Sequence, residues 1–88
     1  MRYLITVSGE VQGVYYRVFA QKKAKELGIN GYIKNMTDGT VYCEAEGEEL
    51  ALEAFADWCA EGSPYSRVES VNVEVSAEKG YEEFEIRK

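Results

Sequence analysis

The sequence predicts an α+β fold in which two helices cover one face of an antiparallel sheet. In several runs hydrophobic and polar residues alternate, as in half-buried strands; in two longer runs hydrophobic residues recur every three or four positions, as in amphipathic helices. The runs follow the order strand, helix, strand, strand, helix, strand, with a short extra strand at the C-terminal end. The 88 residues have room for a single domain, residues 1–88, without internal repeat or linker.

The first strand and the first helix are expected on either side of a loop that contains glycine. Residues 3–8 alternate between two faces and predict a strand. From about Tyr16 to Leu27 the apolar residues lie at helical spacing, with lysines largely on the other faces. Gly28 is expected to end this helix, and Ile29 can supply the apolar contact that often accompanies a glycine C-cap.

A hairpin is predicted next, because Asp38-Gly39 has the chemistry of a turn between two strand-like runs. We expect its strands at Gly31–Asn35 and Gly39–Glu46. In the second strand, residues 41, 43 and 45 alternate with Tyr42, Glu44 and Glu46. This alternation implies that one face lies on a core and that the other face, with its two glutamates, points toward water.

The second half of the chain completes the pattern. Residues from Glu48 to about Ala60 predict a second amphipathic helix, which Gly62-Ser63-Pro64 should end. Alternation over residues 70–76 predicts a strand, and a last short strand should end near Arg87. Two helices on one face of an antiparallel sheet is the economical packing for this order, which is the ferredoxin-like α/β sandwich, βαββαβ.

The charge of the chain narrows its function. A formal net charge of −6 argues against a nucleic-acid or anionic-membrane partner, because both require a basic surface. Residues 1–44 carry six basic against four acidic residues, whereas residues 45–88 carry four against twelve. A small anion would be attracted to the first half, although most such charges only solvate a surface. An RNA-binding sheet is disfavoured because Tyr42 is flanked by Glu44 and Glu46.

The residue types present also limit the chemistry. There is no histidine, which removes the commonest general base and the commonest metal ligand. Cys43 and Cys59 cannot form a zinc site alone; we expect both in the core, although a disulfide between them is geometrically possible. We therefore expect no metal and no cofactor. Because no apolar run suits a signal peptide or a membrane span, we expect a cytoplasmic protein.

Residues Val7 to Arg17 combine the features of a phosphate site. Gly9 and Gly13 allow backbone conformations in which several N–H groups point toward one place. The first turn of the following helix adds unpaired N–H groups and the positive end of its dipole, and Arg17 adds a planar guanidinium. Taken alone, the glycines indicate only a turn more often than a phosphate site, and Arg17 alone would be a surface helix residue.

Two segments, in this order, form a recognisable pair of motifs. The first is Gly9-Glu10-Val11-Gln12-Gly13-Val14-Tyr15-Tyr16-Arg17. The second is Gly31-Tyr32-Ile33-Lys34-Asn35, followed by Gly39-Thr40-Val41 and Gly47. Both segments resemble the signatures of the acylphosphatase family. Gly62-Ser63-Pro64 with Val68, and Tyr81, Phe84 and Ile86 near the end, are also similar to that family, so the resemblance covers nearly the whole chain.

The resemblance implies an acylphosphatase, or acylphosphate phosphohydrolase, that hydrolyses small acyl phosphates to a carboxylate and inorganic phosphate without a metal. It assigns phosphate binding to Arg17 and to the loop residues Val11, Gln12, Gly13, Val14, Tyr15 and Tyr16. It assigns the orientation of the attacking water to Asn35, whose amide can both accept and donate. Without the resemblance, Asn35 would be interpreted as a turn residue at the end of the hairpin.

This chemistry suits a site without histidine. The leaving group is a carboxylate whose conjugate acid has a pKa near about 4, so no general acid is needed to expel it. The expected partners are a small acyl phosphate and inorganic phosphate, as product and inhibitor, with no nucleic acid and no membrane, and we expect a monomer. The alternative is a non-catalytic anion-binding or regulatory module of the same fold.

Overall fold

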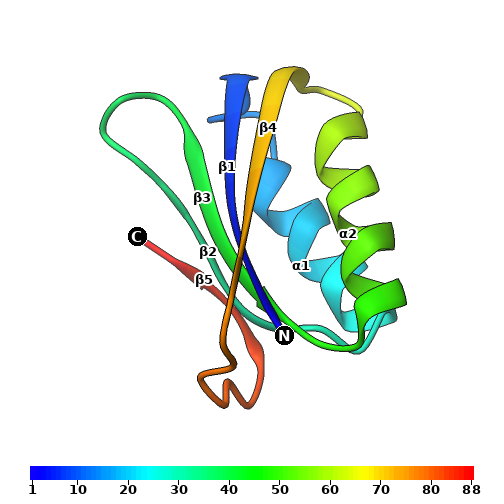
Figure 1. Cartoon of the computed structure of the whole chain (residues 1–88). Coiled ribbons are helices and arrows are strands. Elements are labelled where there is room, and N and C mark those ends of the chain that lie inside the picture. Colours follow the sequence, from blue (N-terminus) through cyan, green and yellow to red (C-terminus); the bar gives the residue numbers. More distant parts are fainter.

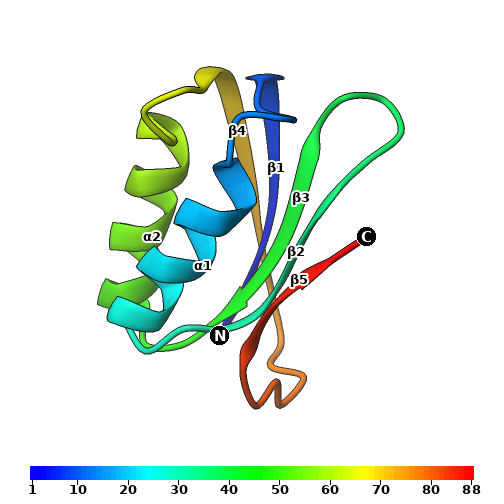
Figure 2. The ribbon, with the colours of Figure 1, turned by 180° about the vertical axis from the view of Figure 1, so that it is seen from behind.

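Five strands form one sheet and two helices pack against one of its faces (Figure 1) in the computed structural model, which describes residues 1–88. The elements are β1 (Arg2–Glu10), α1 (Tyr16–Glu26), β2 (Asn30–Asn35), β3 (Val41–Glu46), α2 (Glu49–Glu61), β4 (Arg67–Ser76) and β5 (Phe84–Arg87). From behind, both helices again lie on one side of the sheet (Figure 2). The predicted ferredoxin-like α/β sandwich is confirmed.

The strands lie in the order β4-β1-β3-β2-β5. β1 pairs antiparallel with β3 and β4, and β2 pairs antiparallel with β3. β5 pairs parallel with β2, so the sheet is mixed and not antiparallel throughout. The reason is the path of the chain: after β4, residues 77–83 cross to the opposite edge of the sheet, and the returning strand then points the same way as β2 (Figure 1).

Local chemistry sets the end of α1 as the sequence predicts. Gly28 has a φ of 71°, which glycine adopts easily. The Ile29 N–H donates to the Ala24 carbonyl at 2.8 Å and the Gly28 N–H donates to the Lys25 carbonyl at 3.3 Å, which is the Schellman pattern. Ile29 is buried, as its expected contact requires. Neither α1 nor α2 is long and apolar enough to cross a membrane.

β4 starts earlier than the alternating pattern predicts, because its pairing with β1 continues through an irregularity. The register shifts between Ser8 and Gly9, as at a β-bulge. Gly9 has a φ of 126°, and a Cβ atom there would lie 2.2 Å from the carbonyl oxygen of Arg67. Only glycine fits this close approach, which guides the end of β1 into the following loop.

The core lies between the sheet and the helices. It contains fifteen buried hydrophobic residues, among them Tyr16 on α1, Phe55 on α2 and Ile33 on β2. Cys43 and Cys59 belong to this core, as predicted, and both are free thiols. Burial raises the pKa of the Cys59 thiol to about 12, so at neutral pH this cysteine is a small hydrophobic residue rather than a nucleophile.

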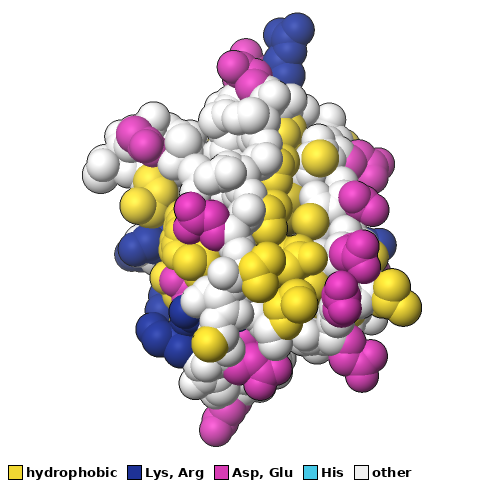
Figure 3. Space-filling view, viewed as in Figure 1, with side chains coloured by type: hydrophobic (Ala, Val, Ile, Leu, Met, Phe, Trp, Pro, Cys, Tyr) yellow, Lys and Arg dark blue, Asp and Glu magenta, His cyan; other side chains and the backbone are white.

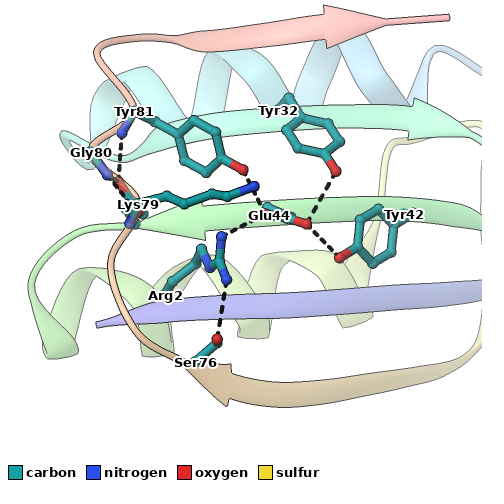
Figure 4. A network of polar contacts seen from close by, with 9 residues as sticks. Arg2, Tyr32, Tyr42, Glu44, Ser76, Lys79, Gly80 and Tyr81 are labelled. Atoms are coloured by element: carbon teal, nitrogen blue, oxygen red, sulfur yellow. Dashed lines mark hydrogen bonds and ion pairs between the residues drawn. The ribbon is translucent and has the colours of Figure 1, made fainter.

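The two glutamates of β3 do not face water, contrary to the prediction from alternation. Glu44 and Glu46 point away from the helices but keep only 9% and 7% of their surface exposed. Figure 4 shows the polar groups that surround the Glu44 carboxylate. It accepts hydrogen bonds from the hydroxyls of Tyr32, Tyr42 and Tyr81 and from the guanidinium of Arg2, at 2.6 to 3.1 Å.

Glu46 fastens the segment that crosses between β4 and β5. Its carboxylate accepts hydrogen bonds from the backbone N–H groups of Lys79, Gly80 and Tyr81. Alternation correctly predicts the face on which Glu44 and Glu46 lie, but it carries no information on a distant segment that folds over that face. The two carboxylates therefore act as structural acceptors, not as solvating groups.

Acidic side chains gather on α2, whose outer surface carries Glu49, Glu53, Asp57 and Glu61 (Figure 3). In the same view a strip of hydrophobic side chains runs between α2 and β4. On β4 itself, Val75 is 65% exposed. Four of the twelve acidic residues in the second half of the sequence therefore lie on the exposed surface of one helix. The loop between β1 and α1 belongs to the less acidic half.

The buried carboxylates predict a loss of stability in acid. Burial alone would raise the pKa of Glu44, but the three tyrosine hydroxyls and the charge of Arg2 lower it below its usual value of 4.5. The pKa of Glu46 is likewise lowered, by backbone N–H groups that outweigh its burial. Because the folded state favours the ionised forms, this stabilisation is present above pH 4.5 and is lost as the pH falls through the lowered folded-state values.

We expect Glu44→Gln to lower the free energy of unfolding at pH 7 by about 1 to 3 kcal/mol, because it weakens the acceptor for four donors and leaves Arg2 without its ion pair. The variant should also lose less stability than wild type on acidification. Urea unfolding at several pH values measures both effects, with the exposed Glu53→Gln as control. Equal losses on acidification in wild type and Glu44→Gln would contradict this role of Glu44.

Candidate active site

A cavity of about 300 Å³ opens at the N-terminal end of α1. The loop before α1 lies at the same end of the sheet as the turn between β2 and β3 (Figure 2). The cavity is lined by Val11, Gly13, Tyr15, Tyr16, Arg17, Val18 and Asn35. It therefore brings together Arg17 and Asn35 and most of the loop residues predicted from the sequence, whereas Gln12 and Val14 do not line it.

The loop presents backbone donors that have no partner within the protein. It runs from the end of β1 at Glu10 to the start of α1 at Tyr16. No backbone N–H group from Val11 to Tyr15 donates a hydrogen bond to another backbone or side-chain group. The first turn of α1 adds its own unpaired N–H groups and the positive end of the helix dipole. Such a concentration of donors favours an anion.

Positive φ angles give the loop its shape. Gly13 has a φ of 73°, and Tyr15, directly before α1, has a φ of 61° and a ψ of 19°. Alternation of right- and left-handed backbone conformations turns successive N–H groups toward one side of the chain. The glycine at position 13 is suited to this geometry. A tyrosine at position 15 is less suited to it, and Tyr15 is the one residue other than glycine that has a positive φ.

Arg17 is the one charged side chain that lines the cavity. Its Nη1 donates to the backbone carbonyl of Arg87 at 3.1 Å, which ties the guanidinium to β5. The guanidinium forms no ion pair with a carboxylate. Because a guanidinium carries five N–H donors, most of them remain available beside the loop. The cavity is therefore positive in a protein of net charge −6.

Asn35, the last residue of β2, enters the cavity from the sheet. Its Oδ1 is buried and has no hydrogen-bond partner. The turn of the hairpin does not use this side chain: the Asp38 carboxylate accepts from the N–H and the hydroxyl of Thr40, at 3.0 and 2.6 Å. A buried amide oxygen without a hydrogen-bond partner lowers stability unless a ligand or a water donates a hydrogen bond to it. Asn35 therefore has an amide oxygen free to bond a ligand or a water, and the hairpin turn does not depend on its side chain.

Gln12 holds the hairpin against the loop. Its Nε2 donates to the carbonyls of Met36 and Thr40, at 2.7 and 2.9 Å. The side chain of Gln12 is therefore occupied, and its backbone N–H is the group left for a ligand. These contacts fix the turn that follows Asn35 relative to the loop. The family resemblance assigns Gln12 to phosphate binding, but nothing in the sequence indicates that its side chain also holds the hairpin.

α2 and the residues after it hold the loop from the other side. The Tyr16 hydroxyl donates to the Cys59 carbonyl, near the end of α2, at 2.8 Å, and its ring lies 5.1 Å from that of Trp58. Burial raises the pKa of Tyr16, whose side chain belongs to the core and leaves only the backbone N–H for the cavity. The Ser63 hydroxyl donates to the Val14 carbonyl at 2.8 Å. The sequence indicated Ser63 only as part of a helix stop.

The described residues contain no group of three or more His, Cys, Asp or Glu side chains arranged to hold a metal ion. The donors at the cavity are N–H groups, which bind anions and not cations. What the arrangement can do chemically is to hold an anion with several oxygens against the loop. It also leaves the Asn35 amide beside that anion to contact a further polar group.

Comparisons with known proteins point to one family. A family model described as Acylphosphatase matches residues 3–86. An acylphosphatase of Deinococcus radiodurans is 46% identical over 86 residues, which cover 98% of this chain and 99% of that protein. An acylphosphatase of Archaeoglobus fulgidus is 48% identical over 82 residues, covering 93% and 92%. The crystal structure of acylphosphatase from Bacillus subtilis is similar with a TM-score of 0.95 and 39% identity, over 99% of this chain and 98% of that one.

Proposed function

Given that this chain belongs to the acylphosphatase family and hydrolyses acyl phosphates, we propose that the loop from Val11 to Arg17 binds the phosphate and that Asn35 orients the attacking water. The observation that carries the proposal is the meeting of three groups at one cavity. These are the unpaired N–H groups of the loop, the Arg17 guanidinium and the Asn35 amide.

Phosphate binding uses the loop as a preformed set of hydrogen-bond donors. The N–H groups and the helix dipole meet the phosphate oxygens, and two parallel N–H groups of Arg17 match two of these oxygens. The same donors stabilise the charge that the equatorial oxygens carry during transfer. Gln12, Ser63 and the bond from Arg17 to β5 support this proposal, because each holds a donor in place before substrate binds.

Hydrolysis then requires a water in line with the bond that breaks. The Asn35 Oδ1 accepts a hydrogen bond from this water, and a phosphate oxygen of the substrate takes its proton. The water oxygen forms a bond to phosphorus while the bond from phosphorus to the acyl oxygen breaks. The electron pair leaves on the carboxylate, which needs no proton because its conjugate acid has a pKa of about 4 and is ionised at neutral pH. The products are the carboxylate and inorganic phosphate.

We propose that no metal and no cofactor takes part, since the loop and Arg17 supply the positive charge that Mg²⁺ supplies in other phosphoryl transfers. Hydrolysis of benzoyl phosphate by the purified protein in EDTA tests this. The alternative, a non-catalytic anion-binding or regulatory module, is disfavoured because similar acylphosphatases match over almost their whole length. Binding of phosphate without turnover of an acyl phosphate would favour it.

We also propose an oligomeric state, a cellular compartment and a set of partners for this enzyme. All the residues assigned to the site come from one chain, so a monomer of one domain, residues 1–88, suffices. The free thiols of Cys43 and Cys59 suit the reducing cytoplasm. Inorganic phosphate should inhibit as a product that occupies the same loop. We propose no nucleic-acid or membrane partner, in keeping with the acidic surface.

Arg17→Lys should abolish most of the activity, because an ammonium cannot donate two parallel hydrogen bonds to two oxygens. We expect kcat/KM to fall about a hundredfold or more, and the inhibition constant for phosphate to rise about tenfold. Steady-state kinetics with phosphate as inhibitor measures both. Lys22→Ala, which removes an exposed cation from the same helix, is the control. Wild-type inhibition by phosphate in Arg17→Lys would exclude Arg17 as the ligand.

Asn35→Ala should separate chemistry from binding. The loop and Arg17 remain, so phosphate should inhibit nearly as in wild type, whereas kcat should fall about a hundred- to a thousandfold because the water loses its acceptor. The matched control is Lys34→Ala, the neighbour on the opposite face of β2. If folded Asn35→Ala turned over benzoyl phosphate at the wild-type rate, or merely lost stability in denaturant, Asn35 would be a structural residue.

A further inference from the structure

Tyr15 occupies a position whose backbone does not suit a large side chain. Its φ of 61° lies in the left-handed region, which glycine and asparagine enter more easily than tyrosine. The core does not require its ring, because the side chain is 66% exposed. Residues held in such conformations tend to lie at sites of function, where the constraint serves a purpose.

The ring of Tyr15 is held on one side and open on the other. Its centroid lies 5.8 Å from that of Tyr65, with an angle of 63° between the planes, which is an edge contact. Tyr65 is itself 66% exposed and belongs to the segment between α2 and β4. The hydrogen bond from Ser63 to Val14 fixes that segment to the loop. The Tyr15 ring is thus positioned by a partner that leaves most of its surface accessible.

The cavity has an apolar part beside its positive part. Among the hydrophobic residues that line it, Tyr15 and Val18 are 66% and 55% exposed and supply this surface, whereas Val11 and Tyr16 are buried in the core. Apolar side chains cannot stabilise a phosphate, since they offer no hydrogen bond. An acyl phosphate, however, consists of a phosphate and an acyl group joined through one oxygen. With the phosphate on the loop N–H groups and Arg17, the acyl group must extend along one of the remaining walls.

We propose that Tyr15 and Val18 form a subsite for the acyl group, and that this protein prefers acyl phosphates whose acyl group is apolar, above all aromatic. The subsite rests on the proposed function of the loop as the phosphate site. Tyr65 is a positioning residue that acts through Tyr15. An aromatic acyl group packs against the open side of the Tyr15 ring, whereas an acetyl group is too small to gain from it.

The test compares kcat/KM for benzoyl phosphate and acetyl phosphate, which share the phosphate and the leaving carboxylate and differ in the ring. Tyr15→Asn removes the ring but keeps a residue that tolerates a positive φ. We expect the benzoyl-to-acetyl ratio to fall about three- to tenfold in Tyr15→Asn, and less in Val18→Ala. Tyr15→Phe should keep the wild-type ratio. Leu50→Ala removes an 80% exposed hydrophobic residue at the start of α2 and should also keep it.

Binding of benzoylphosphonate and acetylphosphonate, which cannot be hydrolysed, is measured by calorimetry in the same variants. A preference for the benzoyl compound that Tyr15→Asn reduces supports the subsite even if turnover is impaired. An equal fall in kcat/KM for both substrates and in affinity for both phosphonates, or an unchanged benzoyl-to-acetyl ratio, would overturn the subsite. Tyr15 would then serve only to shape the loop. Failure of the wild type to hydrolyse either acyl phosphate would overturn the proposed function instead, and the phosphonates would still report on the apolar wall.

Discussion

The loop between β1 and α1 carries five consecutive backbone N–H groups, from Val11 to Tyr15, that bond to nothing else in the protein. Backbone donors are strong hydrogen-bonding groups, and most proteins pair them within secondary structure. Keeping them unpaired and convergent requires that the chain be prevented from relaxing into a tighter turn or a longer helix. Much of the surrounding structure meets this requirement.

Three parts of the fold restrain the loop from different directions. The β1 end is fixed by its bulge against β4, where Gly9 allows the backbones to approach. The hairpin is fixed through Gln12. α2 and its following segment are fixed through Tyr16 and Ser63. In the proposed mechanism, donors held in this way need no reorganisation when charge develops on the phosphate, which is the condition under which hydrogen bonds contribute most to catalysis.

The layout of the sheet explains why two residues far apart in sequence, Arg17 and Asn35, line one cavity. β1 and β2 both neighbour β3 and run antiparallel to it, so their C-terminal ends lie at the same end of the sheet. Arg17 follows β1 through the loop and Asn35 closes β2. The edge strand β5 then adds a carbonyl that holds the guanidinium. The split βαβ arrangement thus supplies both halves of the candidate site.

The sequence predicts those features that local chemistry decides. The end of α1 follows from Gly28 and Ile29, and the faces of β3 follow from alternation. The parallel pairing of β5 and the burial of Glu44 and Glu46 depend on contacts between distant segments, which no local pattern contains.

The candidate site divides in the same way. Spacing alone could indicate a phosphate loop near Arg17, and the resemblance to acylphosphatases added Asn35. The supporting hydrogen bonds of Gln12, Tyr16 and Ser63 became visible only in three dimensions, because each joins the loop to an element that the sequence places elsewhere.

The central claim, that the free N–H groups of this loop form the anion site, is tested most directly by NMR. Inorganic phosphate is titrated into ¹⁵N-labelled protein while backbone amide shifts are followed. We expect the largest shifts, saturating with one dissociation constant, at the amides of Val11 to Arg17, with smaller ones at the Asn35 side chain. Shifts concentrated elsewhere, or none at the loop while phosphate inhibits, would contradict this account.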